Sequence, residues 1–211
     1  MTIVKCEACG SKELTKYGNT YECAYCGSKY LLDADENIVS KELTEARMIA
    51  LLERSKQLHE ADKYSEELDV LIEALEMDDT NSGVIVKLGR CYRCLNLPDK
   101  AMECYKRTIE LNPAMGTAYT NMGTISILRE NYAEALGYYE KGLPLIDKAD
   151  YDYWVANANY AICVAKLGDP KRAEELIKAS EAHGYPKGQA VRRMAGIEHK
   201  SFVTKLRDLF S

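Results

Sequence analysis

Residues 82–113 read SGVIVKLGRCYRCLNLPDKAMECYKRTIELNP, and this stretch decides the fold. Its arrangement of small and large residues recurs at an interval of thirty-four residues, in blocks that begin at Met48, Ser82 and Gly116. A fourth block begins at Trp154, after an insertion of four residues. Because an interval of this length is typical of stacked helical units, each block is predicted to fold as two antiparallel helices.

Fixed slots within the blocks indicate how the two helices pack. Small residues dominate positions 8 and 20, where they let the helices approach closely, and larger side chains occupy position 24. Position 8 holds Ser55, Gly89, Gly123 and Ala161; position 20 holds Glu67, Ala101, Ala135 and Ala173; position 24 holds Leu71, Tyr105, Tyr139 and Ile177. The first block departs from this pattern, since Glu67 stands where the others have alanine.

The second block resembles the tetratricopeptide repeat in Leu88-Gly89, Tyr92, Ala101, Tyr105 and Pro113, and the third block resembles it as well. The resemblance covers roughly residues 45–187. It implies a mostly α protein, a tetratricopeptide-type α-α superhelix whose first helices line a concave groove. Peptides dock in this groove in the family, so the resemblance implies a non-enzymatic scaffold for a protein or peptide partner.

Five polar residues are predicted to face that groove in the usual geometry of the repeat: Lys87, Arg90, Arg93, Asn121 and Asn159. The three basic residues are spaced by three, which places them on one helix face. An asparagine amide can hold a peptide backbone at both its donor and its acceptor. An extended or acidic ligand is therefore expected, and a solvated face without a ligand is the alternative. The family's clamp for chaperone tails is not expected, because Val86 and Arg90 replace its lysine and asparagine.

Two matching segments near the start of the chain, CEACGSK and CAYCGSK, predict a metal site formed by Cys6, Cys9, Cys23 and Cys26. Four thiolates favour a closed, structural zinc site, and iron is the less favoured alternative. The intervening residues predict a hairpin that turns at Gly18-Asn19. The segment resembles the zinc-ribbon family over residues 3–31. Its tyrosines, at positions 17, 21, 25 and 30, are expected to form a minimal core, and stacking on nucleic-acid bases is the alternative.

The remaining pair at Cys-x-x-Cys spacing, Cys91 and Cys94, is interpreted differently. Both cysteines lie within the first predicted helix of the second block, and Leu95 rather than glycine follows them. Free cysteine behaves as a small apolar residue. We therefore expect Cys91, Cys94, Cys104 and Cys163 to pack between helices rather than to bind metal.

These observations predict a zinc ribbon at 1–31, a linker at 32–40, four helical hairpins at 41–187 and C-terminal capping helices at 188–211. Val191, Met194, Ala195 and Ile197 are expected to share the packing face of the cap. Residues 31–81 hold fifteen acidic and five basic side chains, whereas residues 187–211 hold two and six. This asymmetry predicts possible homo-oligomers in which the acidic first repeat meets the basic tail.

No catalytic set is found, since His59, His183 and His199 stand in no recognisable motif. No apolar run is long enough for a membrane span, and the first residues resemble no secretion signal, so a cytoplasmic location is expected. The preferred function is a protein-interaction scaffold. The alternative is a nucleic-acid-associated regulator whose ribbon contacts DNA or RNA while the repeats recruit a partner.

Overall fold

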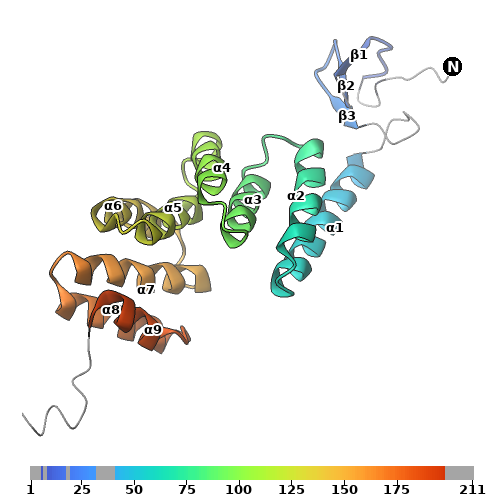
Figure 1. Cartoon of the computed structure of the whole chain (residues 1–211). Helices are drawn as coiled ribbons and strands as arrows, with labels where there is room; N and C mark the ends of the chain where they lie inside the picture. The colour runs from blue at the N-terminus through green and yellow to red at the C-terminus, as the bar shows by residue number, and fades with distance from the viewer. Residues whose placement is uncertain (1–5, 7–8, 18–19, 32–40, 198–211) are drawn as a thin grey trace, which may run out of the picture. The chain divides into compact units, whose positions relative to one another are not determined.

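The computed structural model describes residues 6, 9–17, 20–31 and 41–197. These residues contain a small sheet followed by a succession of helices, and they divide after Val84 into two compact units. The predicted linker at 32–40, the Gly18-Asn19 turn and the basic tail at 198–211 lie outside the described residues. The mostly α fold that the sequence predicts is confirmed (Figure 1).

The sheet in the first unit has three antiparallel strands in the order β1-β2-β3. Strands β1 and β2 pair from Leu14 opposite Cys23 to Tyr17 opposite Thr20. The bounds are Leu14–Tyr17 for β1, Thr20–Cys23 for β2 and Lys29–Leu31 for β3. Strand β2 therefore carries Cys23 at its end and pairs on both edges, which fixes the position of this cysteine.

The first helical hairpin consists of α1 (Lys41–Glu60) and α2 (Tyr64–Met77), which pack against each other. Leu71 and Ala74 of α2 are completely buried. The guanidinium of Arg47 also reaches Glu73, with a nitrogen–oxygen distance of 2.7 Å. The hairpin thus forms in the first block even though that block lacks the usual glycine and alanine.

Glu67 is the charged exception at position 20, and its side chain is fully buried. One carboxylate oxygen accepts a hydrogen bond from the Ser55 hydroxyl at 3.2 Å. The other lies 2.7 Å from Nδ1 of His59, which keeps 24% of its side chain exposed. The later blocks have alanine at position 20, so their two helices can approach closely. In the first block, the hydrogen-bonded side chains of Ser55, His59 and Glu67 lie between the helices instead.

Replacing His59 by alanine is expected to lower the free energy of unfolding of this hairpin by about 2 kcal/mol, because a buried charged group then loses a partner. The loss of unfolding free energy would be measured by hydrogen exchange of the α2 amides at increasing urea concentrations. The double variant His59→Ala/Glu67→Gln should recover part of it, since the amide carries no charge to strand. Equal stability of His59→Ala and the parent chain would contradict this account.

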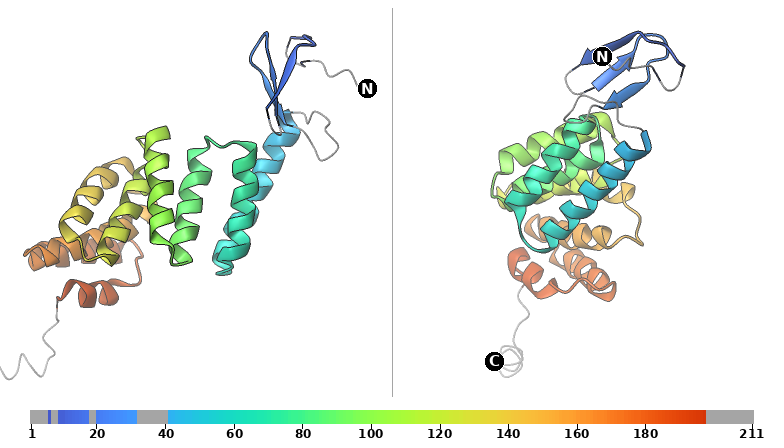
Figure 2. Two further views of the ribbon diagram at one scale, coloured as in Figure 1. Left: turned by 45° about the horizontal axis from the view of Figure 1, so that its top comes forward. Right: turned by 90° about the vertical axis from the view of Figure 1, so that its right-hand side faces the viewer.

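From residue 82 onward the described residues form three further hairpins and a final helix, whose arrangement can be followed in Figures 1 and 2. Their bounds are α3 (Ser82–Cys94) with α4 (Pro98–Leu111), α5 (Gly116–Leu128) with α6 (Tyr132–Gly142), and α7 (Tyr151–Lys166) with α8 (Pro170–Ala182). A short 3-10 helix, η1 (Leu143–Leu145), occupies the insertion before α7. Helix α4 contacts α5, α6 contacts α7, and the first helices α5 and α7 also touch.

The predicted glycine slots explain the close helix packing in two of these hairpins. A Cβ atom added at Gly89 would lie 2.6 Å from the ring of Tyr105, and one at Gly123 would lie 2.8 Å from the ring of Tyr139. Both tyrosine rings are completely buried. The glycine of each first helix therefore provides the surface on which the position-24 tyrosine of the second helix rests.

Helix α9 (Gly188–Ala195) closes the described array by packing on α7 and α8. Val191 and Ala195 of α9 are buried, as expected for residues on its packing face. The expectation is wrong for Met194, which is 50% exposed, because its position lies at the edge of the helix face that carries Val191 and Ala195. No helix of the described residues is long and apolar enough to cross a membrane.

The helical cysteines divide into two pairs. Cys91 and Cys163, which share a repeat position, are completely buried, as expected for small core residues. Cys94 and Cys104 are half-buried. Burial raises the pKa of the Cys163 thiol to about 12 and that of the Cys104 thiol to about 11. These two thiols are therefore protonated near neutral pH and unsuited to act as nucleophiles.

Candidate functional site: the four-cysteine cluster and the polar face of the first helices

The four predicted metal ligands come together in the small sheet domain. The sulfur atoms of Cys6, Cys9, Cys23 and Cys26 all lie within 4.8 Å of one another. Cys6 and Cys23 are buried, whereas Cys9 and Cys26 are exposed. Sulfur–sulfur distances are 3.4 Å from Cys6 to Cys26 and 3.6 Å from Cys9 to Cys23.

The two cysteine pairs sit on turns with the same backbone hydrogen bonds. The amide of Cys6 donates to the Ser11 carbonyl and that of Gly10 to the Cys6 carbonyl; Cys23, Gly27 and Ser28 repeat the pattern. Gly10 and Gly27 have φ values of +73° and +71°, a conformation that glycine adopts without steric cost. The repeated sequence thus folds into two matching knuckles that present sulfur toward a common centre.

The geometry of the cluster fits a tetrahedral zinc ion. With zinc–sulfur bonds of about 2.3 Å, ligands at tetrahedral angles would be separated by about 3.8 Å. The sulfur separations of 3.4 and 3.6 Å, and the 4.8 Å limit on all pairs, lie close to that value. A hydrogen bond with the Ser28 hydroxyl, 3.1 Å from Sγ, lowers the pKa of the Cys26 thiol. The four cysteines can therefore hold one metal ion of this size.

The prediction of a tyrosine core in the ribbon is wrong for Tyr17 and Tyr25. Tyr17 is 62% exposed and Tyr25 is 83% exposed. Tyr21 is half-buried, and the side chain of Tyr30 lies outside the described residues. The buried cluster described for this sheet consists instead of Cys6 and Cys23 with Leu14 packed beside them. The described centre of the sheet is therefore built on cysteines, and two of the four tyrosines lie outside it at the surface.

The predicted binding residues of α3 are half-buried. The Nε atoms of Arg90 and Arg93 are both inaccessible to solvent and have no hydrogen-bond partner among the described residues. Neither arginine forms an ion pair in the described part of the chain, whereas Lys87 does have an interaction. Two cationic groups therefore lie partly buried on one helix without a described anionic partner.

Two tyrosine hydroxyls that the sequence reasoning did not single out lie beside these groups. Burial raises the pKa of Tyr105, and the charge and side-chain hydrogen bond of Arg93, with a smaller effect of the Arg90 charge, oppose the rise. Burial also raises the pKa of Tyr139, while Thr124, Asn159 and Arg93 oppose that rise. The recurrence of tyrosine at position 24 in consecutive blocks was the available sequence signal.

The predicted asparagines are placed differently from each other. Asn159 of α7 is half-buried, and it opposes the rise in the pKa of the Tyr139 hydroxyl. This hydroxyl lies 2.9 Å from Oγ1 of Thr124. Asn121 of α5 is half-buried too, but within the described residues no hydrogen bond joins it to the arginines or to Asn159. The Tyr139 hydroxyl contacts Thr124, and the role of both asparagines in binding stays a prediction.

Residues 83–115 match the family described as Tetratricopeptide repeat. A human protein, Protein O-mannosyl-transferase TMTC1, is 35% identical over 89 residues, which are 40% of this chain and 10% of the human protein. This chain thus spans about a tenth of that relative. Among solved structures, pilF of Pseudomonas aeruginosa aligns with a TM-score of 0.63 and 16% identity, over 79% of this chain and 76% of pilF.

A second solved structure is the first repeat domain of Spaghetti (RPAP3) bound to the HSP90 peptide SRMEEVD. It aligns with a TM-score of 0.50 and 20% identity, over 58% of this chain and 94% of that domain. The chain therefore contains a tetratricopeptide repeat and has the fold of tetratricopeptide repeat proteins. Proteins with this fold serve as interaction scaffolds, and some of them bind peptides.

Proposed function

We propose that this chain is a non-enzymatic scaffold that binds an extended segment of a partner protein on the face formed by the first helices α3, α5 and α7. The observation that carries the proposal is the pair of guanidinium groups of Arg90 and Arg93, whose Nε atoms are buried without a partner. A buried donor without an acceptor costs about 1–3 kcal/mol, so a ligand that supplies acceptors would gain affinity there.

The neighbouring first helices supply neutral polar groups for the rest of such a segment. Asn121 and Asn159 hold the same repeat position on α5 and α7, and both are half-buried. An amide both donates and accepts, which suits a peptide backbone. The peptide bound by the Spaghetti domain, SRMEEVD, shows that a related fold can hold a segment that contains acidic residues. We propose the same general mode of binding here, with different residues.

The proposal of a non-enzymatic role rests on the surroundings of the histidines. His59 is engaged by Glu67. The ring of His183 stacks on Trp154 with centroids 3.7 Å apart, and its Nδ1 lies 2.8 Å from the Ala179 carbonyl oxygen. Both imidazoles therefore have packing partners that account for their presence without catalysis. His199 lies outside the described residues.

For the ribbon, we propose a structural zinc ion held by Cys6, Cys9, Cys23 and Cys26. Four protein ligands close the coordination sphere, so the ion would support the fold rather than activate water. The eight cysteines, all within the described residues, form no disulfide. Reduced thiols suit a cytoplasmic location, which is part of the same proposal.

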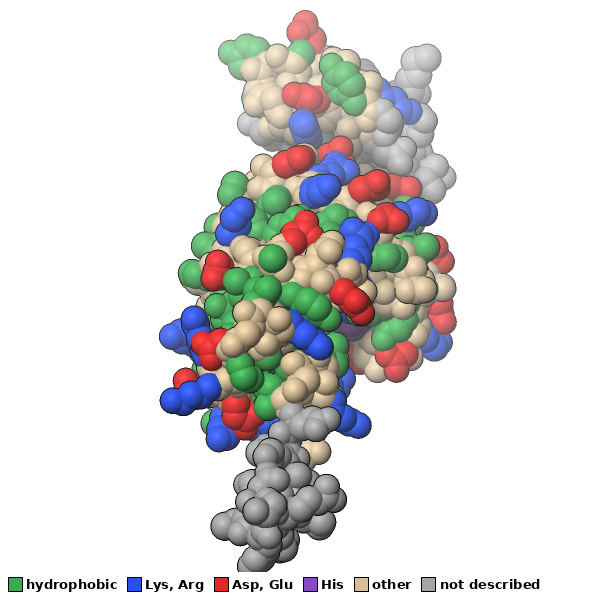
Figure 3. All heavy atoms as spheres, turned by 60° about the vertical axis from the view of Figure 1, so that its left-hand side comes forward, with side chains coloured by type: hydrophobic (Ala, Val, Ile, Leu, Met, Phe, Trp, Pro, Cys, Tyr) green, Lys and Arg blue, Asp and Glu red, His purple; other side chains and the backbone are tan. Residues whose placement is uncertain are grey.

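The charge of the ribbon disfavours the nucleic-acid alternative. Residues 1–30 hold four basic and three acidic side chains, a balance of +1. Four thiolates and one divalent zinc ion would add −2, which makes the loaded ribbon slightly negative. Acidic and basic side chains are also interspersed over the face seen in Figure 3. Nucleic acids bind to surfaces rich in lysine and arginine, because their phosphates are negatively charged. Among its described residues the ribbon lacks such a surface, so a protein partner fits it better.

A selection from random octapeptides displayed on phage would test the proposed function. Peptides that bind the parent chain should bind the Arg90→Glu variant at least about tenfold more weakly, because the reversed charge repels an acidic segment. Lys106→Glu is the matched control, since this exposed lysine lies on the second helix of the same hairpin. A selection that enriches no peptide, or peptides that ignore the Arg90→Glu change, would contradict binding on this face.

A further inference from the structure

The hairpins α3/α4 and α5/α6 are built alike but differ in one hydrogen bond. In each, a position-24 tyrosine, Tyr105 or Tyr139, is completely buried against the glycine of the first helix. The Tyr139 hydroxyl lies 2.9 Å from Oγ1 of Thr124. The buried Tyr105 hydroxyl finds no acceptor for its proton among the described residues, because the guanidinium of Arg93, which lies beside it, can only donate. The two hairpins therefore serve as an internal comparison.

The difference follows from the residue at position 9 of the first helix. Thr124 occupies this position on α5, and Arg90 occupies it on α3. A threonine hydroxyl can accept a hydrogen bond, whereas a guanidinium group only donates. Tyr105 therefore faces donors where Tyr139 has an acceptor. An acceptor from outside the hairpin would complete the set.

Three donor-bearing side chains belong to this region: Arg90 and Arg93, spaced by three on α3, and Tyr105, whose ring packs on Gly89 next to Arg90. Each has a buried polar atom without a partner in the described part of the chain. The arginines supply two positive charges and the tyrosine supplies a hydroxyl proton, so the complementary group is an anion with several acceptor oxygens. Desolvation cost rises with the square of the charge, so a singly charged carboxylate reaches a buried hydroxyl more cheaply than a doubly charged phosphate.

We propose that Arg90, Arg93 and Tyr105 form a carboxylate seat that takes an aspartate or glutamate side chain of the bound peptide. This inference rests on the proposed function and adds the chemistry of one ligand residue and a specificity role for Tyr105. The hydroxyl of Tyr105 donates to one carboxylate oxygen, and the guanidinium groups donate to both oxygens.

The test uses a fluorescein-labelled octapeptide from the phage selection and its variants in which each acidic residue is replaced by the matching amide. Fluorescence anisotropy with the full chain should show that one such replacement weakens binding about tenfold or more, as for a lost charged hydrogen-bond set. Tyr105→Phe should weaken binding of the acidic peptide to a similar extent and leave the amide peptide unaffected. Tyr139→Phe is the matched control and should not discriminate between the two peptides.

Arg93→Gln provides a second variant that does not alter the buried ring. Thermal unfolding monitored by circular dichroism would establish that each variant is folded. Selected peptides that lack acids, or an amide peptide that binds as tightly as the acidic one, would overturn the seat but leave the scaffold function standing. Tighter binding of a phosphoserine replacement would overturn the choice of carboxylate. A selection without any binding peptide would overturn both proposals.

Discussion

Replacing Cys23 by serine is expected to abolish metal binding and unfold the ribbon while the helical hairpins stay folded. The buried cluster described for the ribbon holds only Cys6 and Cys23 with Leu14 beside them, which is too little apolar surface to maintain three short strands. A structural zinc site supplies about 10–16 kcal/mol at neutral pH, so its loss exceeds any stability the strands have alone.

Elemental analysis of the purified chain should find one zinc per molecule, and none in the Cys23→Ser variant. Addition of a chelator should collapse the ribbon amide resonances while leaving those of α3 to α9 in place. Cys94→Ser is the control, because this half-buried helical cysteine lies outside the metal cluster. Ribbon resonances that survive chelation would show that the metal is dispensable. Visible absorption typical of iron–thiolate bonding would identify iron instead.

The helical part of this fold could be anticipated because its packing rules repeat. Gly89 with Tyr105 and Gly123 with Tyr139 occupy the same slots in consecutive blocks, and the structure shows that each ring rests on its glycine. The second and third blocks also begin where α3 and α5 begin, at Ser82 and Gly116. A single sequence reveals this pairing of glycine and tyrosine because the same residues recur at the same positions of consecutive blocks.

Features that occur once were out of reach of the same reasoning. Glu67 breaks the small-residue rule, and its burial depends on two partners from α1, Ser55 and His59, which no repeat position specifies. Likewise the cysteine spacing predicted the metal cluster, but it did not show that Tyr17 and Tyr25 would stay exposed. The Tyr105 hydroxyl lacks an acceptor because Arg90 stands where the next hairpin has Thr124, and no rule of the repeat specifies that residue.

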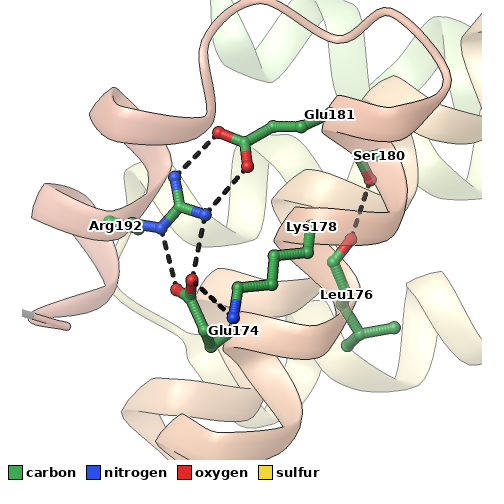
Figure 4. A network of polar contacts seen from close by, with 6 residues as sticks. All are labelled: Glu174, Leu176, Lys178, Ser180, Glu181 and Arg192. Carbon is green, nitrogen blue, oxygen red and sulfur yellow. Dashed lines mark hydrogen bonds and ion pairs between the residues drawn. The ribbon is translucent and has the colours of Figure 1, made fainter.

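A different unique feature holds the last helix in place. Arg192 of α9 is only 8% exposed and bonds to two carboxylates of α8 (Figure 4). Its Nε and Nη2 lie 2.8 and 3.0 Å from the oxygens of Glu174. Its Nη1 and Nη2 lie 2.7 and 2.9 Å from those of Glu181. The hydrogen bonds with both carboxylates raise the pKa of Arg192, so the side chain is charged whenever the protein is folded.

The Arg192→Met variant is expected to lose about 3 kcal/mol of unfolding free energy, because the half-buried carboxylate of Glu174 then loses its buried partner, whereas Glu181 is exposed to solvent. The effect should appear first in α9, as faster hydrogen exchange of its amides, and then as a lower urea midpoint for the second unit. Arg193→Met is a close control, since this neighbouring arginine is exposed. Adding Glu174→Gln and Glu181→Gln to Arg192→Met should restore much of the stability, because the stranded charges are then gone. If Arg192→Met and Arg193→Met unfold at the same urea concentration, the ion pairs contribute nothing, and the apolar contacts of Val191 and Ala195 alone dock the helix.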